Sequence, residues 1–207
     1  MIISIKNKFI FIHTFKTGGS SIQHALNTIG AGQVDKFGDL EISFHSRAYW
    51  ITEIMGKELF DSLFSFAFVR NPWDIQYSLY KYMLRNKKHH RHEEIIKTRN
   101  FEHYLKLTYY KFLERRYDNG DDLDMQMSFV CDKDSRQIVK YIGRFENLNN
   151  DFDYILNEIG FDPKKIKLPH HNKSTQGDYR LRYNSKMVDW VAEMHERDIK
   201  FFGYIFE

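Results

Sequence analysis

The sequence predicts an α/β fold with a three-layer parallel sheet, because apolar strand-like runs alternate with amphipathic helical patterns. The first run, Phe9–Ile12, stops at a glycine turn, and a helical pattern follows at once. The second run, Phe64–Val69, is typical of a strand that is buried on both faces of a parallel sheet. The chain of 207 residues is long enough for a real hydrophobic core, and we expect one domain over residues 1–207.

The glycine turn predicts an anion-binding site. Ile22, Leu26 and Ile29 have helical spacing, so the turn lies at a helix N-terminus, where backbone N–H groups and the helix dipole favour negative charge. Glycines without a Cβ let these N–H groups approach an oxyanion, Lys16 adds a positive charge, and hydroxyls add donors. The residues concerned are Lys16, Thr17, Gly18, Gly19, Ser20 and Ser21. The alternative is an ordinary turn with a solvated lysine.

This turn differs from the phosphate-binding loop of ATP and GTP hydrolases. That loop reads G-x-x-x-x-G-K-[ST], with its lysine after the glycines. Here Lys16 precedes Gly18 and Gly19, and no glycine lies upstream at the required spacing. The order of residues therefore argues against a nucleotide-dependent kinase.

The second strand predicts a site at its carboxyl end. Arg70 follows the strand, at the edge where open α/β sheets bind ligands. Asn71 is suited to cap the next helix, and Pro72 is suited to its first position. Ser78 can turn its hydroxyl toward the same crevice. For Arg70, a structural ion pair is the alternative to a ligand contact.

Two later helices and a third strand complete the predicted fold. Apolar residues at 138–142 indicate a third buried strand. Apolar spacing predicts one helix at 152–159, which ends at Gly160, and a last helix at 187–194.

Three stretches, in this order, resemble the sulfotransferase superfamily: Lys16-Thr17-Gly18-Gly19-Ser20-Ser21, Phe68-Val69-Arg70-Asn71-Pro72-Trp73-Asp74 with Ser78, and Gly143-Arg144-Phe145-Glu146-Asn147-Leu148. The C-terminal stretches Leu168-Pro169-His170-His171-Asn172-Lys173-Ser174, Tyr179, Tyr183 and Arg197-Asp198 with Phe202-Gly203-Tyr204 match as well. The carbohydrate-type branch, which includes heparan-sulfate 2-O- and chondroitin-type enzymes and bacterial relatives, is the most similar. The resemblance implies a P-loop-NTPase-like sulfotransferase fold.

The resemblance also implies a donor, 3′-phosphoadenosine 5′-phosphosulfate (PAPS), and roles for the quoted residues. Residues 16–21 would hold the 5′-phosphosulfate, with Lys16 neutralising the leaving phosphate. Arg70 and Ser78 would hold the 3′-phosphate, because an arginine fork and a serine hydroxyl suit a phosphate. Asn172, Lys173 and Ser174 would fold over the nucleotide. The family needs no metal ion for this reaction.

An acceptor hydroxyl needs a base, and the resemblance favours His45. Carbohydrate-type relatives place a catalytic histidine between the two donor motifs, and the context His45-Ser46-Arg47-Ala48 is a partial match. An ordinary histidine titrates near neutrality, so it can accept a proton there. His13, at the end of the first strand, is the rival.

Composition limits the partners. The net charge of +3 predicts no general nucleic-acid binding. The basic run at 87–92 is either a solvated helix end or a rim for an anionic sugar. A single cysteine excludes an internal disulfide, and no apolar run suggests a signal peptide or a membrane span, so we expect a cytoplasmic protein.

We therefore predict a PAPS-dependent sulfotransferase that acts on a hydroxyl-bearing acceptor, and we expect this acceptor to be a saccharide. A nucleotide-dependent kinase and a non-catalytic nucleotide-binding module are the alternatives. The acceptor specificity and the oligomeric state leave no pattern in the sequence.

Overall fold

The computed structural model describes residues 1–32, 36–118, 125–169 and 177–207. The chain divides into two compact units. The first unit comprises Met1–Arg70 and Gln126–Lys173, and the second comprises Asn71–Met125 and Ser174–Glu207.

The first unit contains a four-stranded sheet in the order β1-β2-β5-β6. Its strands are β1 (Ile2–Ser4), β2 (Phe9–Ile12), β5 (Phe64–Val69) and β6 (Tyr141–Arg144). The strands β2, β5 and β6 are parallel, as the sequence predicts. The short strand β1 adds an antiparallel edge, because only a tight turn joins it to β2 and a parallel pair needs a longer crossover.

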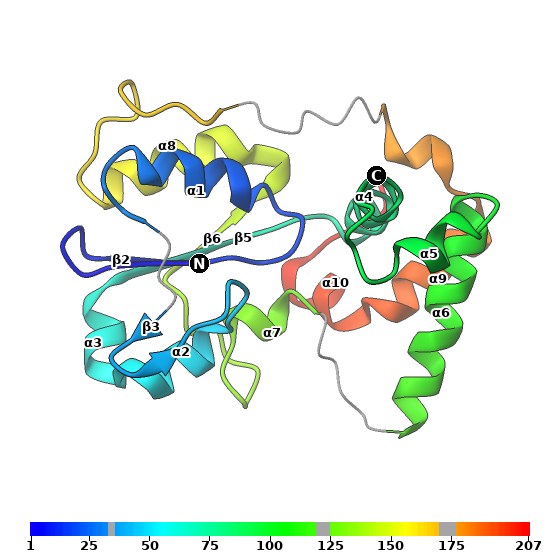
Figure 1. The fold of residues 1–207 in the computed structure, drawn as a ribbon, viewed down its shortest axis with the longest axis horizontal. Coiled ribbons are helices and arrows are strands. Elements are labelled where there is room, and N and C mark those ends of the chain that lie inside the picture. The colour runs from blue at the N-terminus through cyan, green and yellow to red at the C-terminus, as the bar shows by residue number, and fades with distance from the viewer. Residues whose placement is uncertain (33–35, 119–124, 170–176) are drawn as a thin grey trace. The chain divides into compact units, whose positions relative to one another are not determined.

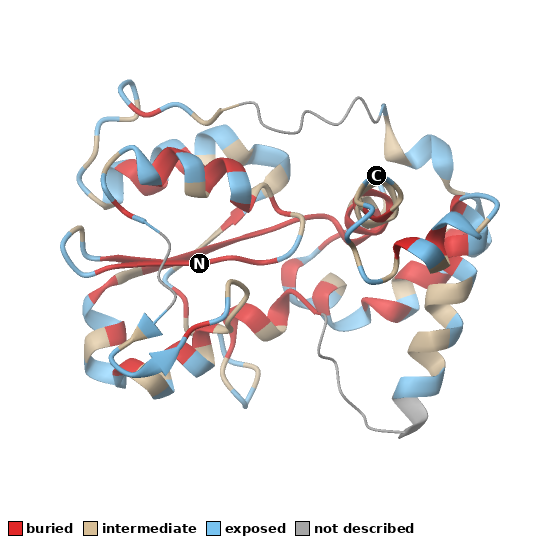
Figure 2. Ribbon diagram, viewed as in Figure 1, coloured by how far each residue is buried: buried red, intermediate tan, exposed pale blue. Residues whose placement is uncertain are grey.

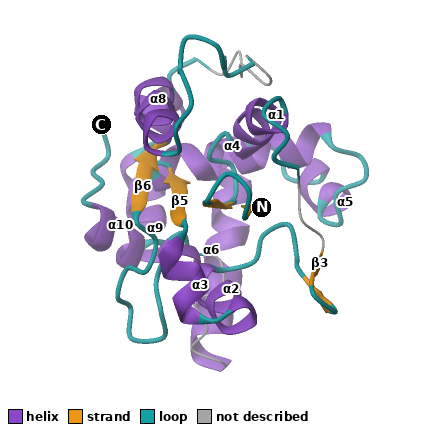
Figure 3. Ribbon diagram, turned by 90° about the vertical axis from the view of Figure 1, so that its left-hand side faces the viewer, coloured by secondary structure: helices purple, strands orange, loops and turns teal. Residues whose placement is uncertain are grey.

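Helices cover both faces of this sheet. On one face lie α1 (Gly19–Asn27) and α8 (Leu148–Glu158), and on the other lie α2 (Ala48–Met55), α3 (Lys57–Ser62) and α7 (Met127–Val130) (Figure 1). Figure 3 shows the same layers from the side, with β5 and β6 between the two sets of helices. A turn of 3-10 helix, Phe145–Asn147, and a small hairpin of β3 (Lys36–Phe37) and β4 (Leu40–Glu41) complete the unit. The expected three-layer α/β fold is confirmed.

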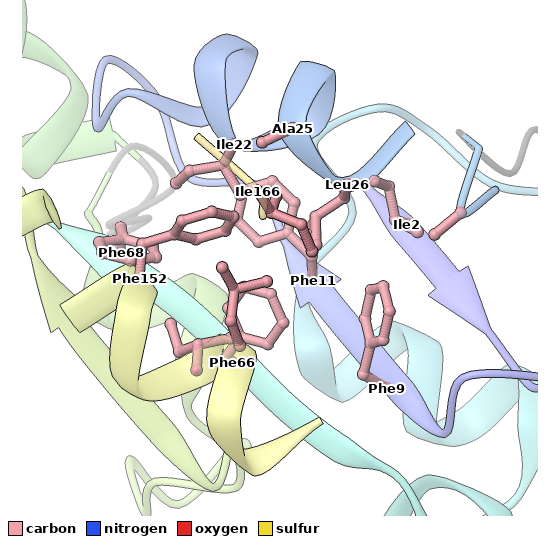
Figure 4. Close-up of a cluster of buried hydrophobic side chains, with 13 residues drawn as sticks. Ile2, Phe9, Phe11, Ile22, Ala25, Leu26, Phe66, Phe68, Phe152 and Ile166 are labelled. Atoms are coloured by element: carbon pink, nitrogen blue, oxygen red, sulfur yellow. The ribbon is translucent and has the colours of Figure 1, made fainter. Parts of the chain in front are cut away.

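Aromatic side chains form the core between the sheet and α1 with α8. Phe9 and Phe11 of β2 and Phe66 and Phe68 of β5 are fully buried there, and Phe11 stacks on Phe66 with ring centroids 5.2 Å apart (Figure 4). Apolar residues of α1 and α8 close this layer: Ile22, Ala25, Leu26, Phe152, Ile155 and Leu156. Figure 2 shows that the central strands are buried along their length, which explains their nearly continuous apolar sequence.

The third strand begins later than the sequence predicts, at Tyr141 instead of residue 138. The preceding residues belong to a hairpin-like turn in which Cys131 bridges Gln137 and the N–H of Ile138 donates to the carbonyl of Val130 at 2.9 Å. Because Ile138 pairs with Val130, it does not belong to β6 of the main sheet. Apolar character alone does not show whether a residue pairs with Val130 or with the main sheet.

The second unit is helical. It contains α4 (Pro72–Arg85), α5 (His92–Ile96), α6 (Phe101–Asp118), α9 (Ser185–Met194), α10 (Glu196–Phe202) and a 3-10 turn at Tyr179–Arg182. As predicted, Asn71 caps α4, because its side chain accepts from the N–H of Trp73 at 3.1 Å, and Pro72 takes the first helical position. Trp73 in turn donates from Nε1 to the carbonyl of Val188, and its own carbonyl accepts from the hydroxyl of Tyr183. These bonds join α4 to the C-terminal segment.

A buried polar chain also crosses the second unit. The hydroxyl of Tyr104 donates to Oε1 of Gln76 at 2.9 Å, and Nε2 of Gln76 lies 2.9 Å from Nε2 of His195. Because the Gln76 amide nitrogen only donates, Nε2 of His195 accepts and Nδ1 carries the proton. That Nδ1 lies 3.7 Å from a carboxylate oxygen of the buried Asp198. This series of polar contacts thus links α6, α4 and α10.

None of the helices in the described part of the chain is both long enough and apolar enough to cross a membrane.

Gly143 should be required in β6 because the ring of Phe68 lies across it. A Cβ built on Gly143 would come within 2.5 Å of Cε1 of Phe68, and that ring is fully buried, so it has little room to move. We expect Gly143→Ala to lower the free energy of unfolding by about 1–3 kcal/mol, measured by urea denaturation. Gly32→Ala is the matched control, since nothing lies within 4 Å of its Cβ position. Equal stability of the two variants would show that the Phe68 ring yields.

Candidate functional site

The loop between β2 and α1 has the geometry of an anion site. Lys16 has a φ of 59° and Gly18 a φ of 82°, so both lie in the left-handed region. For a residue with a Cβ this conformation costs about 1–2 kcal/mol, and Gly18 avoids that cost. Helix α1 starts directly after Gly18, whose carbonyl already accepts from the N–H of Ser21 at 2.9 Å. Gly19 and Ser20 are therefore the first-turn residues whose N–H groups helix geometry leaves without an acceptor. The backbone of this donor loop, residues 13–21, is therefore held in a strained turn above a helix N-terminus.

The second glycine of the loop is needed for a different reason. Gly19 has no positive φ, but the imidazole of His13 occupies the space that its side chain would need. A Cβ on Gly19 would lie 2.0 Å from Nε2 of His13. Glycine at this position lets the histidine ring pack directly against the start of α1.

Two buried threonines hold the loop from inside. The hydroxyl of Thr14 donates to the carbonyl of Phe68 on the neighbouring strand. The hydroxyl of Thr17 lies 2.9 Å from that of Thr14 and donates to the Thr14 carbonyl at 3.1 Å. Of the predicted donor-binding hydroxyls, that of Thr17 is thus used inside the loop, whereas Ser20 is exposed at the start of α1.

Arg70 connects the second strand to this loop. Its side chain is 6% exposed, and Nη1 donates to the carbonyl of Lys16 at 2.9 Å. Its backbone makes a pair of bonds with the amide of Gln126, at 2.7 and 2.9 Å. The guanidinium is thus held by a backbone carbonyl of the donor loop. Whether Arg70 also makes a structural ion pair or binds a ligand stays a prediction.

Phe145 links the third sequence stretch to the first two. Cζ of Arg70 lies 3.9 Å from the centre of the Phe145 ring, which is a cation–π contact. The same ring lies 3.4 Å from the Cβ position of Gly18, and Leu148 lies 3.1 Å from that Cβ position. The family resemblance includes residues 143–148 but implies no role for Phe145. Gln126 belongs to none of the motifs, so the sequence predicts no role for it either.

His45 is held in one tautomer beside the donor loop. Its Nδ1 lies 2.8 Å from the carbonyl oxygen of His13, and a carbonyl only accepts, so Nδ1 carries the proton and Nε2 keeps a lone pair. The ring packs against Phe15, with centroids 4.0 Å apart, and against His13 and Phe44, each at 4.8 Å. Burial lowers the pKa of His45 below 6.5, and the hydrogen bond to His13 opposes that shift.

His13, the rival base, is in a different state. Burial lowers its pKa to about 3, and the neighbouring His45 and Lys16 add to the shift. Its side chain is 4% exposed, and Nδ1 is buried without a hydrogen-bond partner. A group with so low a pKa is a weak proton acceptor at neutral pH, so the structure favours His45 over His13 as a base.

The other predicted residues lie elsewhere. Ser78 is buried on α4 of the second unit. Asn172, Lys173 and Ser174 lie outside the described residues. In the basic run, Nδ1 of His92 lies 2.8 Å from the carbonyl of Met83, and Nδ1 of His89 accepts from the N–H of Arg91. Within the described ranges, no three His, Cys, Asp or Glu residues are grouped so that they could hold a metal ion.

Comparisons with known proteins identify the family and similar folds. The model of the sulfotransferase family matches residues 1–205. An uncharacterised protein of Archaeoglobus fulgidus is 28% identical over 133 residues, which span 64% of this chain and 96% of that protein. The crystal structure of mouse sulfotransferase SULT7A1 complexed with PAP matches 96% of this chain and 86% of its own, with a TM-score of 0.53 and 15% identity. At that identity, the match shows a shared fold.

Stability should fall in acid because of His13. The unfolded chain binds a proton at this histidine near pH 6.5, whereas the folded chain binds it only near pH 3. Between these values the unfolded state holds more protons, so the free energy of unfolding decreases as the pH falls, by up to about 1.4 kcal/mol per pH unit.

His13→Phe keeps a flat ring against Gly19 and removes the titrating group. We expect urea denaturation between pH 6.5 and pH 3.5 to show a shallower decline for this variant than for the wild type. His103→Gln, a change of an exposed histidine on α6, is the control and should keep the wild-type slope. A variant slope equal to that of the wild type would mean that His13 is protonated in the folded protein.

Proposed function

This chain belongs to the sulfotransferase family, and we propose that it moves a sulfuryl group from PAPS to a hydroxyl group of a carbohydrate acceptor. The observation that carries the proposal is the donor loop, where Lys16 is held in a left-handed turn next to the N-terminus of α1. A loop of this kind binds a dianionic group through backbone N–H groups and one lysine. The lysine does not have to follow the glycines, as it does in the phosphate-binding loop of ATP and GTP hydrolases.

The donor loop is proposed to bind the 5′-phosphosulfate. The N–H groups at the start of α1, with the hydroxyls of Ser20 and Ser21, provide donors for the phosphate oxygens. Lys16 would neutralise the charge that appears on the phosphate as the S–O bond breaks. Charge that develops only in the transition state is where a fixed cation accelerates a reaction most.

Arg70 is proposed to bind the 3′-phosphate, with Ser78 as a second donor. The warrant for Arg70 is its position at the carboxyl end of β5 and its contacts with Lys16 and Phe145. The bond to the Lys16 carbonyl would make the 3′-phosphate site and the donor loop mechanically dependent on each other. For Ser78, Lys173 and Ser174, the family resemblance is the only support.

His45 is proposed to be the general base. With Nδ1 bonded to the His13 carbonyl, Nε2 is the nitrogen that can take the proton of the acceptor hydroxyl. The acceptor oxygen then forms its bond to sulfur while the bond from sulfur to the phosphate oxygen breaks. The carbohydrate acceptor itself rests on the resemblance of the His45 context to carbohydrate-type enzymes.

A donor-binding experiment tests this function directly. We expect 3′-phosphoadenosine 5′-phosphate to raise the melting temperature in the presence of EDTA, whereas ATP should raise it much less. Labelled PAPS should transfer its sulfuryl group to a carbohydrate in an acceptor screen. Lys16→Ala should lower that turnover by about 10²–10³-fold and weaken nucleotide binding far less.

Lys57→Ala on α3, an exposed lysine that pairs with Asp61, is the matched control and should behave as the wild type. A melting temperature that rises equally with ATP would favour the kinase alternative. Nucleotide binding without turnover of any acceptor would favour a non-catalytic module.

The proton-acceptor role of His45 should appear in the pH profile. The base works only when neutral, and because its pKa is lowered below 6.5, turnover should rise with pH and level off with a midpoint below 6.5. His45→Ala should lose about 10²–10⁴-fold in turnover, lose this rising limb, and still bind 3′-phosphoadenosine 5′-phosphate. His103→Ala is the control for loss of an exposed histidine. Retention of more than about a tenth of the wild-type turnover in His45→Ala would place the base elsewhere.

A further inference from the structure

Phe15 is the one strongly apolar side chain that the donor loop leaves exposed. Its neighbours His13, Thr14 and Thr17 are buried, but Phe15 is 39% exposed. Covering an apolar ring stabilises a protein, and a polar side chain would suit an exposed loop position better. Single exposed apolar side chains are common on protein surfaces, so what distinguishes Phe15 is its set of ring contacts.

The ring of Phe15 is nevertheless held in place. One side stacks on the imidazole of His45, with centroids 4.0 Å apart and planes inclined by 32°. Its edge meets the ring of Phe129 on α7 at 5.4 Å, almost at a right angle. Two ring contacts from different segments give Phe15 a fixed orientation without covering it.

Phe15 contacts one of the two proposed reacting groups and is adjacent in the chain to the other. It touches His45, which is proposed to take the acceptor proton, and it precedes Lys16, which is proposed to face the donor. A molecule that lies on the exposed part of the Phe15 ring would therefore be close to His45.

We propose that Phe15 determines acceptor specificity, as a flat apolar platform on which a ring-shaped acceptor lies while its hydroxyl faces His45. This rests on the proposed function, because it uses the same base and donor loop. The acceptor would be a molecule with a flat apolar ring face, which both a pyranose and a phenol have. Aromatic side chains bind such faces with a defined geometry, whereas a flexible open-chain polyol offers no comparable face.

Three probes separate ring recognition from hydroxyl recognition. Methyl β-D-glucopyranoside offers a sugar ring, 2-naphthol offers an aromatic ring, and sorbitol is an open-chain polyol. Labelled PAPS measures KM and kcat for each probe. Binding of each probe to the protein loaded with 3′-phosphoadenosine 5′-phosphate is measured by saturation-transfer NMR, so the result does not depend on turnover.

Phe15→Ala should raise KM for the preferred ring probe by about 5–20-fold, with little change in kcat, and should weaken its NMR binding to match. KM for sorbitol and the affinity for 3′-phosphoadenosine 5′-phosphate should not change. Phe15→Tyr keeps the platform and should restore wild-type KM. The ring probe that loses most affinity identifies the acceptor as a sugar or a phenol.

Two controls exclude simpler effects. Tyr154→Ala removes another stacked aromatic ring, which is 45% exposed on α8 and lies 4.6 Å from the ring of Tyr141, and it should leave every KM unchanged. Kinetics at about pH 8, well above the ordinary titration of a histidine, prevent a change in the protonation of His45 from altering the result.

Each outcome decides one of the two proposals. Equal loss of ring and open-chain probes in Phe15→Ala, or no loss of either, overturns the platform. Binding of a ring probe that depends on Phe15, with no sulfuryl transfer to any acceptor by the wild type, keeps the platform and removes the proposed transferase activity.

Discussion

The hydrogen bond from Arg70 to the carbonyl of Lys16 connects the end of strand β5 to the donor loop, and the other contacts of the candidate site depend on this connection. It joins two residues that are 54 positions apart and fixes the backbone where Lys16 has its left-handed φ. A strained residue of this kind persists only when several contacts hold it in place. The ring of Phe145 provides one of them, because it supports the guanidinium and also lies beside Gly18. Arg70, Phe145 and the donor loop therefore form one interlocked structure within the first unit.

The two histidines show how burial separates the roles of similar groups. His13 is packed against Gly19 and kept neutral by desolvation, and its backbone carbonyl orients the ring of His45. His45 is half-buried, keeps its lone pair on Nε2 and has a pKa that is lowered less severely. A fully desolvated imidazole and a half-buried one thus lie side by side. Phe15 adds a third ring to this group and is the most exposed of the three.

Glycine has three separate physical purposes around this site. Gly18 permits a positive φ, Gly19 makes space for the imidazole of His13, and Gly143 makes space for the ring of Phe68. Only the first purpose is conformational. The other two come from rings that belong to distant segments, so a turn-propensity argument applied to the sequence does not find them.

The sequence by itself determined the strands β2 and β5, the donor loop, the start of α4 and the family. Each of these depends on neighbouring residues: apolar runs, a glycine pair before a helical pattern, and Asn71 with Pro72 at a helix start. The sequence did not determine that β1 pairs with β2 in the antiparallel direction or that β6 starts only at Tyr141. Apolar residues suit a strand equally well whichever segment the strand pairs with. Tertiary structure alone decided the partners of Arg70, the tautomer of His45 and the exposure of Phe15. These depend on which distant rings and carbonyl groups meet when the sheet and its helices pack, and local spacing contains no record of those contacts.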